Sequence, residues 1–78
     1  MITLSDAETY LDAFNWCDGN EFLTSYKIAL NYDYCPRWDS YMETQFRLMQ
    51  QNPLRFVKKW HKTASTIVAR YIERTNAD

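Results

Sequence analysis

The chain has 78 residues, of which 46% are hydrophobic and 24% charged, and its formal net charge is −1. This length allows one compact domain with a single core and excludes a multidomain assembly. No linker, repeat or low-complexity segment argues for dividing the chain, so we expect residues 1–78 to form a single domain.

The two cysteines, Cys17 and Cys35, lie far apart and form no CxxC unit, and the chain starts without a leader of the secretory type. This usage favours a reducing, cytoplasmic environment. No apolar run approaches the ~18 residues that cross a bilayer, so we expect no membrane partner.

Glycine occurs only once, at Gly19, whereas small β folds use several glycines in their tight turns. We therefore predict an all-α fold, a compact bundle of three to four helices. The first helix is predicted over 6–17, because Ser5 and Glu8 have the spacing of a capping box. Trp16 projects almost opposite the apolar stripe of this helix and is a candidate surface residue.

Residues 22–34 allow two interpretations. With Asn20 as cap, Phe22, Leu23 and Tyr26 share one helical face. Apolar side chains also alternate through 22–34, which fits a strand and an α+β fold. The helix is preferred because no other segment alternates well enough to pair with such a strand. In the helix, Ile28 and Tyr32 form a second apolar pair away from the main face.

A third helix is predicted over 37–51, where Gln45 projects into an apolar arc. Its amide would need partners there, so Gln45 marks either a hydrogen-bonded core position or an exposed groove. A fourth helix is predicted over 53–74, with Asn52 as cap and Pro53 as its first residue. Its apolar face comprises Val57, Trp60, Ala64, Ile67, Val68 and Tyr71.

Charge is unevenly distributed along the chain. Residues 1–39 contain seven acidic and two basic residues, and residues 40–78 contain seven basic and three acidic residues. Four of these bases crowd one face of the predicted last helix, so either the acidic half neutralises them, or they form a solvated face, or they bind an anion. The candidate nucleic-acid-binding residues are Arg55, Lys58, Lys59, Lys62 and Arg70.

Catalytic patterns are weak in this sequence. His61 is the single histidine, and no phosphate-binding glycine loop, GxSxG or HExxH motif occurs. Cys17, Cys35 and His61 lack the regular spacing of metal ligands. We therefore expect no enzyme, no metal and no cofactor.

The segment 31–41, NYDYCPRWDSY, gathers large aromatic side chains at a predicted bend. The chain has more rings than a core of this size can hold, and tyrosine and tryptophan tolerate exposure. These rings either close one end of the bundle as a second small core or form an interface. The candidate partner-binding residues are Tyr32, Tyr34, Arg37 and Trp38, with Ile28 and Trp16.

Three functions follow from these surfaces. The first is a small, non-enzymatic protein-binding module that occludes a partner, the class to which phage-encoded inhibitors of nucleic-acid-processing machines, such as anti-CRISPR proteins, belong. The second is a nucleic-acid-binding protein that uses the basic face, although the pI near 5.7 argues against it. The third is a structural protein that self-associates as a homodimer through Ile28 and Tyr32.

Overall fold

The structure, a computed structural model, describes residues 4–31 and 39–76, and within these ranges it contains helices and no strand. The helices are α1 (Leu4–Trp16), α2 (Gly19–Leu30), α3 (Asp39–Gln51), α4 (Pro53–Lys59) and α5 (His61–Asn76). The all-α prediction is confirmed, although the described part has five helices rather than three to four. The alternative strand is wrong for residues 22–30, which are helical, and residues 32–34 lie outside the described ranges.

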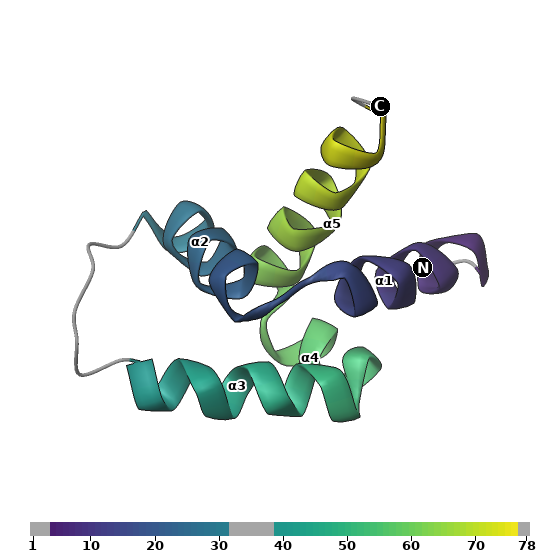
Figure 1. The fold of residues 1–78 in the computed structure, drawn as a ribbon. Helices are drawn as coiled ribbons and strands as arrows, with labels where there is room; N and C mark the ends of the chain where they lie inside the picture. The colour runs from purple at the N-terminus through teal and green to yellow at the C-terminus, as the bar shows by residue number, and fades with distance from the viewer. Residues whose placement is uncertain (1–3, 32–38, 77–78) are drawn as a thin grey trace.

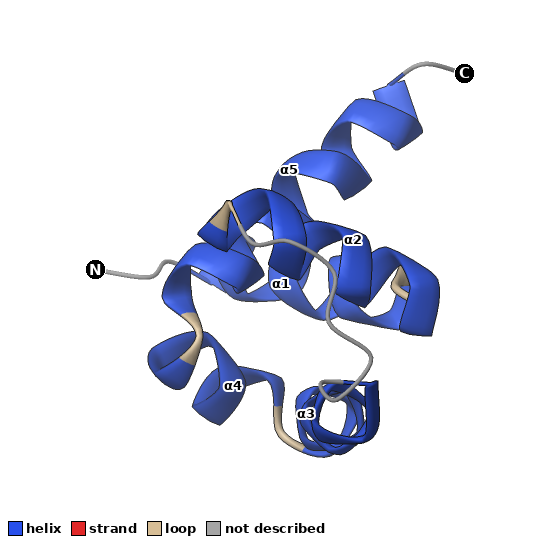
Figure 2. Cartoon of the chain, turned by 90° about the vertical axis from the view of Figure 1, so that its left-hand side faces the viewer, coloured by secondary structure: helices blue, strands red, loops and turns tan. Residues whose placement is uncertain are grey.

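Helices that are far apart in the sequence make the main packing contacts. The most extensive contact joins α2 to α5, and α1 also packs on α5. α3 lies along α4, and α5 extends away from this pair toward the carboxyl end (Figure 1). Figure 2 shows α3 end-on beside α4, with α1, α2 and α5 grouped on the other side. Contacts of α4 with α1 and α5, and of α3 with α1 and α2, join the two groups.

Local signals explain where two of the helices begin. The side chain of Asp18 accepts a hydrogen bond from the backbone N–H of Glu21 at 2.8 Å and caps α2, so the predicted cap at Asn20 is wrong by two positions. The Asn52 side chain accepts from the Arg55 N–H at 3.2 Å and Pro53 begins α4, as predicted. α1 begins at Leu4, so Ser5 lies inside the helix and not at its cap.

The predicted continuous helix over 53–74 is wrong, because the chain breaks at Trp60 into α4 and α5. Trp60 has φ −120° and ψ 51°, outside the helical range. Its backbone still accepts a hydrogen bond from Ala64 N–H at 2.8 Å, and its own N–H donates to Phe56 at 2.7 Å. No glycine or proline marks the break, which we attribute to the contacts that hold the indole ring in place.

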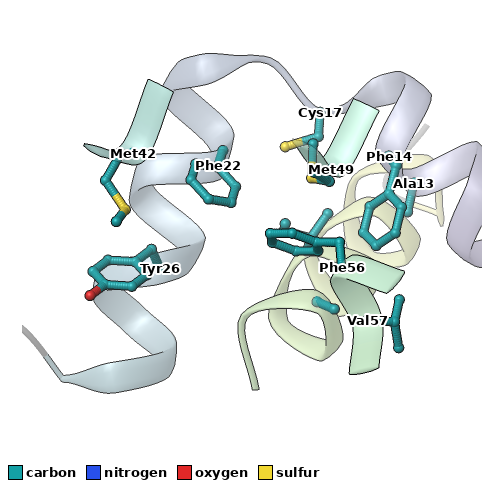
Figure 3. Close-up of a cluster of buried hydrophobic side chains, with 11 residues drawn as sticks. Ala13, Phe14, Cys17, Phe22, Tyr26, Met42, Met49, Phe56 and Val57 are labelled. Carbon is teal, nitrogen blue, oxygen red and sulfur yellow. The ribbon is translucent and has the colours of Figure 1, made fainter. Parts of the chain in front are cut away.

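The core draws on α1 to α5 and on Cys17, which directly follows α1, and Phe56 lies at its centre (Figure 3). The Phe56 ring lies 5.8 Å from both Phe14 and Phe22, measured between centroids, with an edge-on contact to Phe14. The buried apolar side chains are Ala13, Phe14, Cys17, Phe22, Tyr26, Met42, Met49, Phe56, Val57, Ala64 and Ile67. Leu48 of α3, however, is 45% exposed, because it lines a groove between α3 and α4.

Polar contacts connect helices that are distant in sequence. The Gln50 amide donates to the backbone carbonyls of Phe14 (3.1 Å) and Cys17 (3.3 Å), which satisfies acceptors that the end of α1 leaves open. Glu21 of α2 binds Arg70 of α5 through two hydrogen bonds of 2.8 and 3.2 Å, and it also pairs with Arg74 at 3.0 Å. Among the described helices, none has both the length and the apolar character needed to cross a bilayer.

Candidate binding groove between α3 and α4

A groove of about 400 Å³ lies between α3 and α4. The two helices are joined by the single residue Asn52, so the carboxyl end of α3 and the whole of α4 lie against each other. Side chains at helical spacings face the groove from both sides. The α3–α4 groove is lined by Gln45, Leu48, Gln51, Asn52, Arg55, Phe56, Lys59 and Trp60.

The apolar part of the groove is made by Leu48, Phe56 and Trp60. Leu48 is 45% exposed, Trp60 is half-buried and Phe56 is buried beneath them. The Phe56 and Trp60 rings stack at a centroid distance of 6.4 Å, and the Tyr26 and Tyr41 rings lie edge-on to the indole at 6.0 and 6.2 Å. Trp60 is therefore held firmly, whereas Leu48 leaves apolar surface open to a ligand.

Gln45 is 4% exposed and lines the same groove. Its Oε1 accepts a hydrogen bond from the Trp60 indole nitrogen at 2.9 Å. Because an indole N–H can only donate, the amide oxygen must face it and the Nε2 group remains as a donor. No described residue accepts from Nε2. Gln45 thus combines the two roles predicted as alternatives, a hydrogen-bonded core position and a groove residue.

The rim of the groove is basic. Arg55 and Lys59 line it one helical turn apart, and Lys58 and Lys62 are exposed nearby. The Lys59 ammonium lies 5.7 Å from the centroid of the Trp60 ring, within the range of a cation–π interaction. Over residues 4–31 and 39–76, no carboxylate forms an ion pair with any of these four cations. The predicted neutralisation by the acidic half is therefore not seen in that part of the chain.

Arg70, the fifth residue of the predicted nucleic-acid-binding set, lies elsewhere, on α5. Its guanidinium is bound to Glu21, and the hydrogen bond between them lowers the pKa of the Glu21 carboxyl and raises the pKa of Arg70. The structure therefore places Arg55 and Lys59 in the groove lining, leaves Lys58 and Lys62 exposed outside it, and assigns Arg70 to a contact that holds α2 to α5.

The structure describes only two of the six predicted partner-binding residues, Ile28 and Trp16. Tyr32, Tyr34, Arg37 and Trp38 lie outside the described residues. Ile28 is 56% exposed, which leaves it open for the predicted self-association. Trp16 is half-buried and its ring packs on Tyr71 of α5 at 5.7 Å, so part of this candidate surface residue is covered.

Three other possible sites in the described part, a buried thiol, possible metal ligands and a second pocket, offer less support for a function. Burial, together with the nearby charges of Asp18 and Glu21, raises the pKa of the Cys17 thiol to about 12, so the thiol is protonated at neutral pH. The residues that the structure describes contain no group of three side chains able to hold a metal ion. A second hollow of about 310 Å³ between α2 and α3 has the Glu43 carboxylate in its lining and no basic side chain.

The sequence predicted the basic side chains, and it predicted a groove at Gln45 as one of two alternatives, but it did not predict that Arg55 and Lys59 line that groove. The available signal was the amide of Gln45 within an apolar arc. The helix break at Trp60, which brings the indole N–H into hydrogen-bond contact with that amide, is not marked by any residue pattern in the sequence. Comparisons with models of protein families, with curated proteins and with solved structures each found no match.

Proposed function

We propose that this protein is a small, non-enzymatic binding module that occludes a surface of a protein partner, and that the α3–α4 groove takes part in the contact. One observation carries the proposal: an open groove combines an apolar floor with two cations that no described carboxylate neutralises. Protein interfaces are enriched in tryptophan and arginine, and their strongest contacts occupy such pockets.

The charge distribution supports a finer proposal, in which the partner is a nucleic-acid-processing complex and binding inhibits it, as small phage-encoded anti-CRISPR proteins do. Residues 1–39 carry seven acidic side chains against two basic ones. Such an acidic half can compete with nucleic acid for a basic surface on the partner. The predicted aromatic anchors Tyr32, Tyr34 and Trp38, which belong to the same half of the sequence, would add apolar contact area.

Affinity purification from cells that naturally produce the protein tests the main proposal. The tagged wild type is compared with Arg55→Glu/Lys59→Glu, which reverses the groove cations, and with Lys58→Glu/Lys62→Glu, which makes the same change in net charge outside the groove lining. Trp38→Ala tests the aromatic segment separately. We expect a stoichiometric protein partner that is lost with the groove pair or with Trp38→Ala. Equal recovery with all variants, or no partner at all, would contradict the proposal.

Nucleic-acid binding is the second candidate, and four cations on α4 and the start of α5 favour it, because no carboxylate among the described residues forms an ion pair with them. Four phosphate contacts predict an affinity that falls steeply with salt, with a slope of about −0.9 per contact on duplex DNA. A titration of DNA and RNA at two ionic strengths tests this candidate. Absence of binding at low salt would remove it.

A further inference from the structure

We propose that the α3–α4 groove recognises an acidic amphipathic segment of a protein, in which a carboxylate lies beside a large apolar side chain. This inference rests on the proposed function and specifies the chemistry of the partner. It depends on three properties of the groove: an exposed apolar floor, the Gln45 Nε2 donor, which has no acceptor among the described residues, and two rim cations.

The floor selects for an apolar side chain. Leu48 has 45% of its surface in contact with water and lines the groove together with Trp60 and Phe56. A leucine or phenylalanine side chain from a partner would cover this surface and gain the free energy of apolar burial. The groove volume of about 400 Å³ lies within the usual range of sites that enclose a ligand and is large enough for such a side chain.

The donors select for a carboxylate. Gln45 is 96% buried, since 4% of its surface is exposed, and its Nε2 has no acceptor among the described residues. In the groove this N–H donor is available to an acceptor that enters, such as a carboxylate oxygen. Arg55 and Lys59 line the same groove and add positive charge, which strengthens the hydrogen bonds of an anionic acceptor.

The same geometry favours a protein segment over a nucleic acid. Proteins that bind single strands offer open aromatic faces on which bases stack. Here the Phe56 ring stacks on Trp60 and the Lys59 ammonium lies over the indole, so much of that ring is already covered. A phosphate backbone would also leave the apolar surface of Leu48 unused. An acidic segment with an apolar anchor uses both parts of the groove.

The test uses a fluorescein-labelled synthetic peptide that is helical, with leucines one turn apart flanked by glutamates, and measures binding by fluorescence anisotropy. Two control peptides replace either the leucines by serine or the glutamates by glutamine. We expect the wild-type protein to bind the first peptide at least ~10-fold more tightly than either control, a difference that corresponds to about 1.4 kcal/mol.

Variants assign the binding to the groove. Arg55→Glu/Lys59→Glu and Leu48→Ser should each weaken peptide binding at least ~10-fold, whereas Lys58→Glu/Lys62→Glu should change it by less than ~3-fold. Gln45→Glu keeps an acceptor for the Trp60 indole but removes the donor and adds a negative charge, so it should also weaken binding. Circular dichroism of each variant shows whether a loss of binding reflects unfolding. Leu48 and the four bases are exposed and their replacement should preserve the fold.

The outcomes separate this inference from the proposed function. If the peptide fails to bind while Arg55→Glu/Lys59→Glu still abolishes capture of a protein partner, the inference is wrong and the proposed function stands. If both pairs of charge reversals weaken binding equally and DNA competes at low salt, both are wrong and the nucleic-acid alternative is favoured. Selective loss with the groove variants alone supports the inference.

Discussion

Gln45 and Trp60 are joined by a 2.9 Å hydrogen bond from the indole nitrogen to the amide oxygen, which ties α3 to the junction of α4 and α5. The Gln45 side chain is nearly fully buried, and the indole is half-buried between Tyr26 and Tyr41. This contact therefore fixes both the position of the helix break and one wall of the groove.

Removing either partner of this hydrogen bond should destabilise the protein. We expect Trp60→Phe and Gln45→Leu each to lower the free energy of unfolding by about 1–3 kcal/mol, because each leaves a polar group without its partner. The double variant should lose less than the sum of the two single losses, since the second substitution removes the group that the first left unpaired. Urea denaturation of the four proteins measures this coupling, and strictly additive losses would show that the bond contributes nothing of its own.

The ion pair between Glu21 and Arg70 should make stability depend on acid pH. The folded-state pKa of Glu21 is lowered, chiefly by its hydrogen bond to Arg70, so the unfolded chain binds a proton more readily than the folded one. The stabilisation is complete above the ordinary glutamate pKa of about 4.3 and is lost as the pH falls through the lower folded value.

Thermal unfolding from neutral pH to pH ~2 therefore should show Glu21→Gln less stable than wild type at neutral pH, with the difference shrinking in acid. Glu8→Gln is the matched control, because Glu8 is exposed on α1 and forms no ion pair within the described ranges. A constant difference between Glu21→Gln and wild type at all pH values would contradict the predicted linkage.

The thiol of Cys17 should resist chemical modification in the folded protein. It is 3% exposed and its pKa is raised to about 12, first by burial, so little reactive thiolate is present at neutral pH. In a Cys35→Ser background, iodoacetamide should modify Cys17 only after denaturation, as read by mass spectrometry. Rapid modification of the native protein would show that α1 opens readily.

The raised pKa of Cys17 also predicts a loss of stability at alkaline pH. The unfolded thiol ionises near pH 9.0, whereas the folded one stays protonated up to about pH 12. Between these values the unfolded state releases the proton more readily, so the free energy of unfolding should fall as the pH rises. Cys17→Ala should show a smaller fall in the same urea denaturation series, and identical slopes for the two proteins would rule out this contribution.

Two substitutions at neighbouring positions at the start of α2 should change stability in opposite directions. Asp18→Ala removes the cap of the helix and should lower stability by about 1 kcal/mol. Gly19→Ala should raise it by up to about 1 kcal/mol, because a methyl group at this position meets nothing within 4 Å and the unfolded chain loses freedom. Urea denaturation midpoints of both variants check this, and a destabilising Gly19→Ala would reveal a constraint on the backbone between α1 and α2.

The sequence could predict those features that depend on neighbours along the chain. Asn52 and Pro53 specify the start of α4 through local hydrogen bonding and a fixed φ angle, and both roles are confirmed. Ala64 and Ile67 of the predicted apolar face are likewise buried, because helical periodicity within α5 places them on one side, and Val57 is buried on α4.

The features that sequence reasoning missed depend on contacts between distant segments. Trp60 interrupts the last predicted helix through contacts with Gln45, Tyr26 and Tyr41, none of which is adjacent in sequence. Arg70 is part of a basic pattern in the sequence, but its guanidinium binds Glu21 on another helix. The cap of α2 was also predicted wrongly, because Asp18 and Asn20 are comparable N-cap residues and cap preference alone does not choose between them.

The pairing of α2 with α5 also has a consequence for synthesis of the chain on the ribosome. Phe22 and Tyr26 emerge well before residues 61–76, so the newly made amino-terminal part lacks the helix that covers much of α2. Until translation reaches α5, the face of α2 that packs on α5 remains open to water or to a chaperone. Folding of this protein therefore finishes only when its last helix has been released.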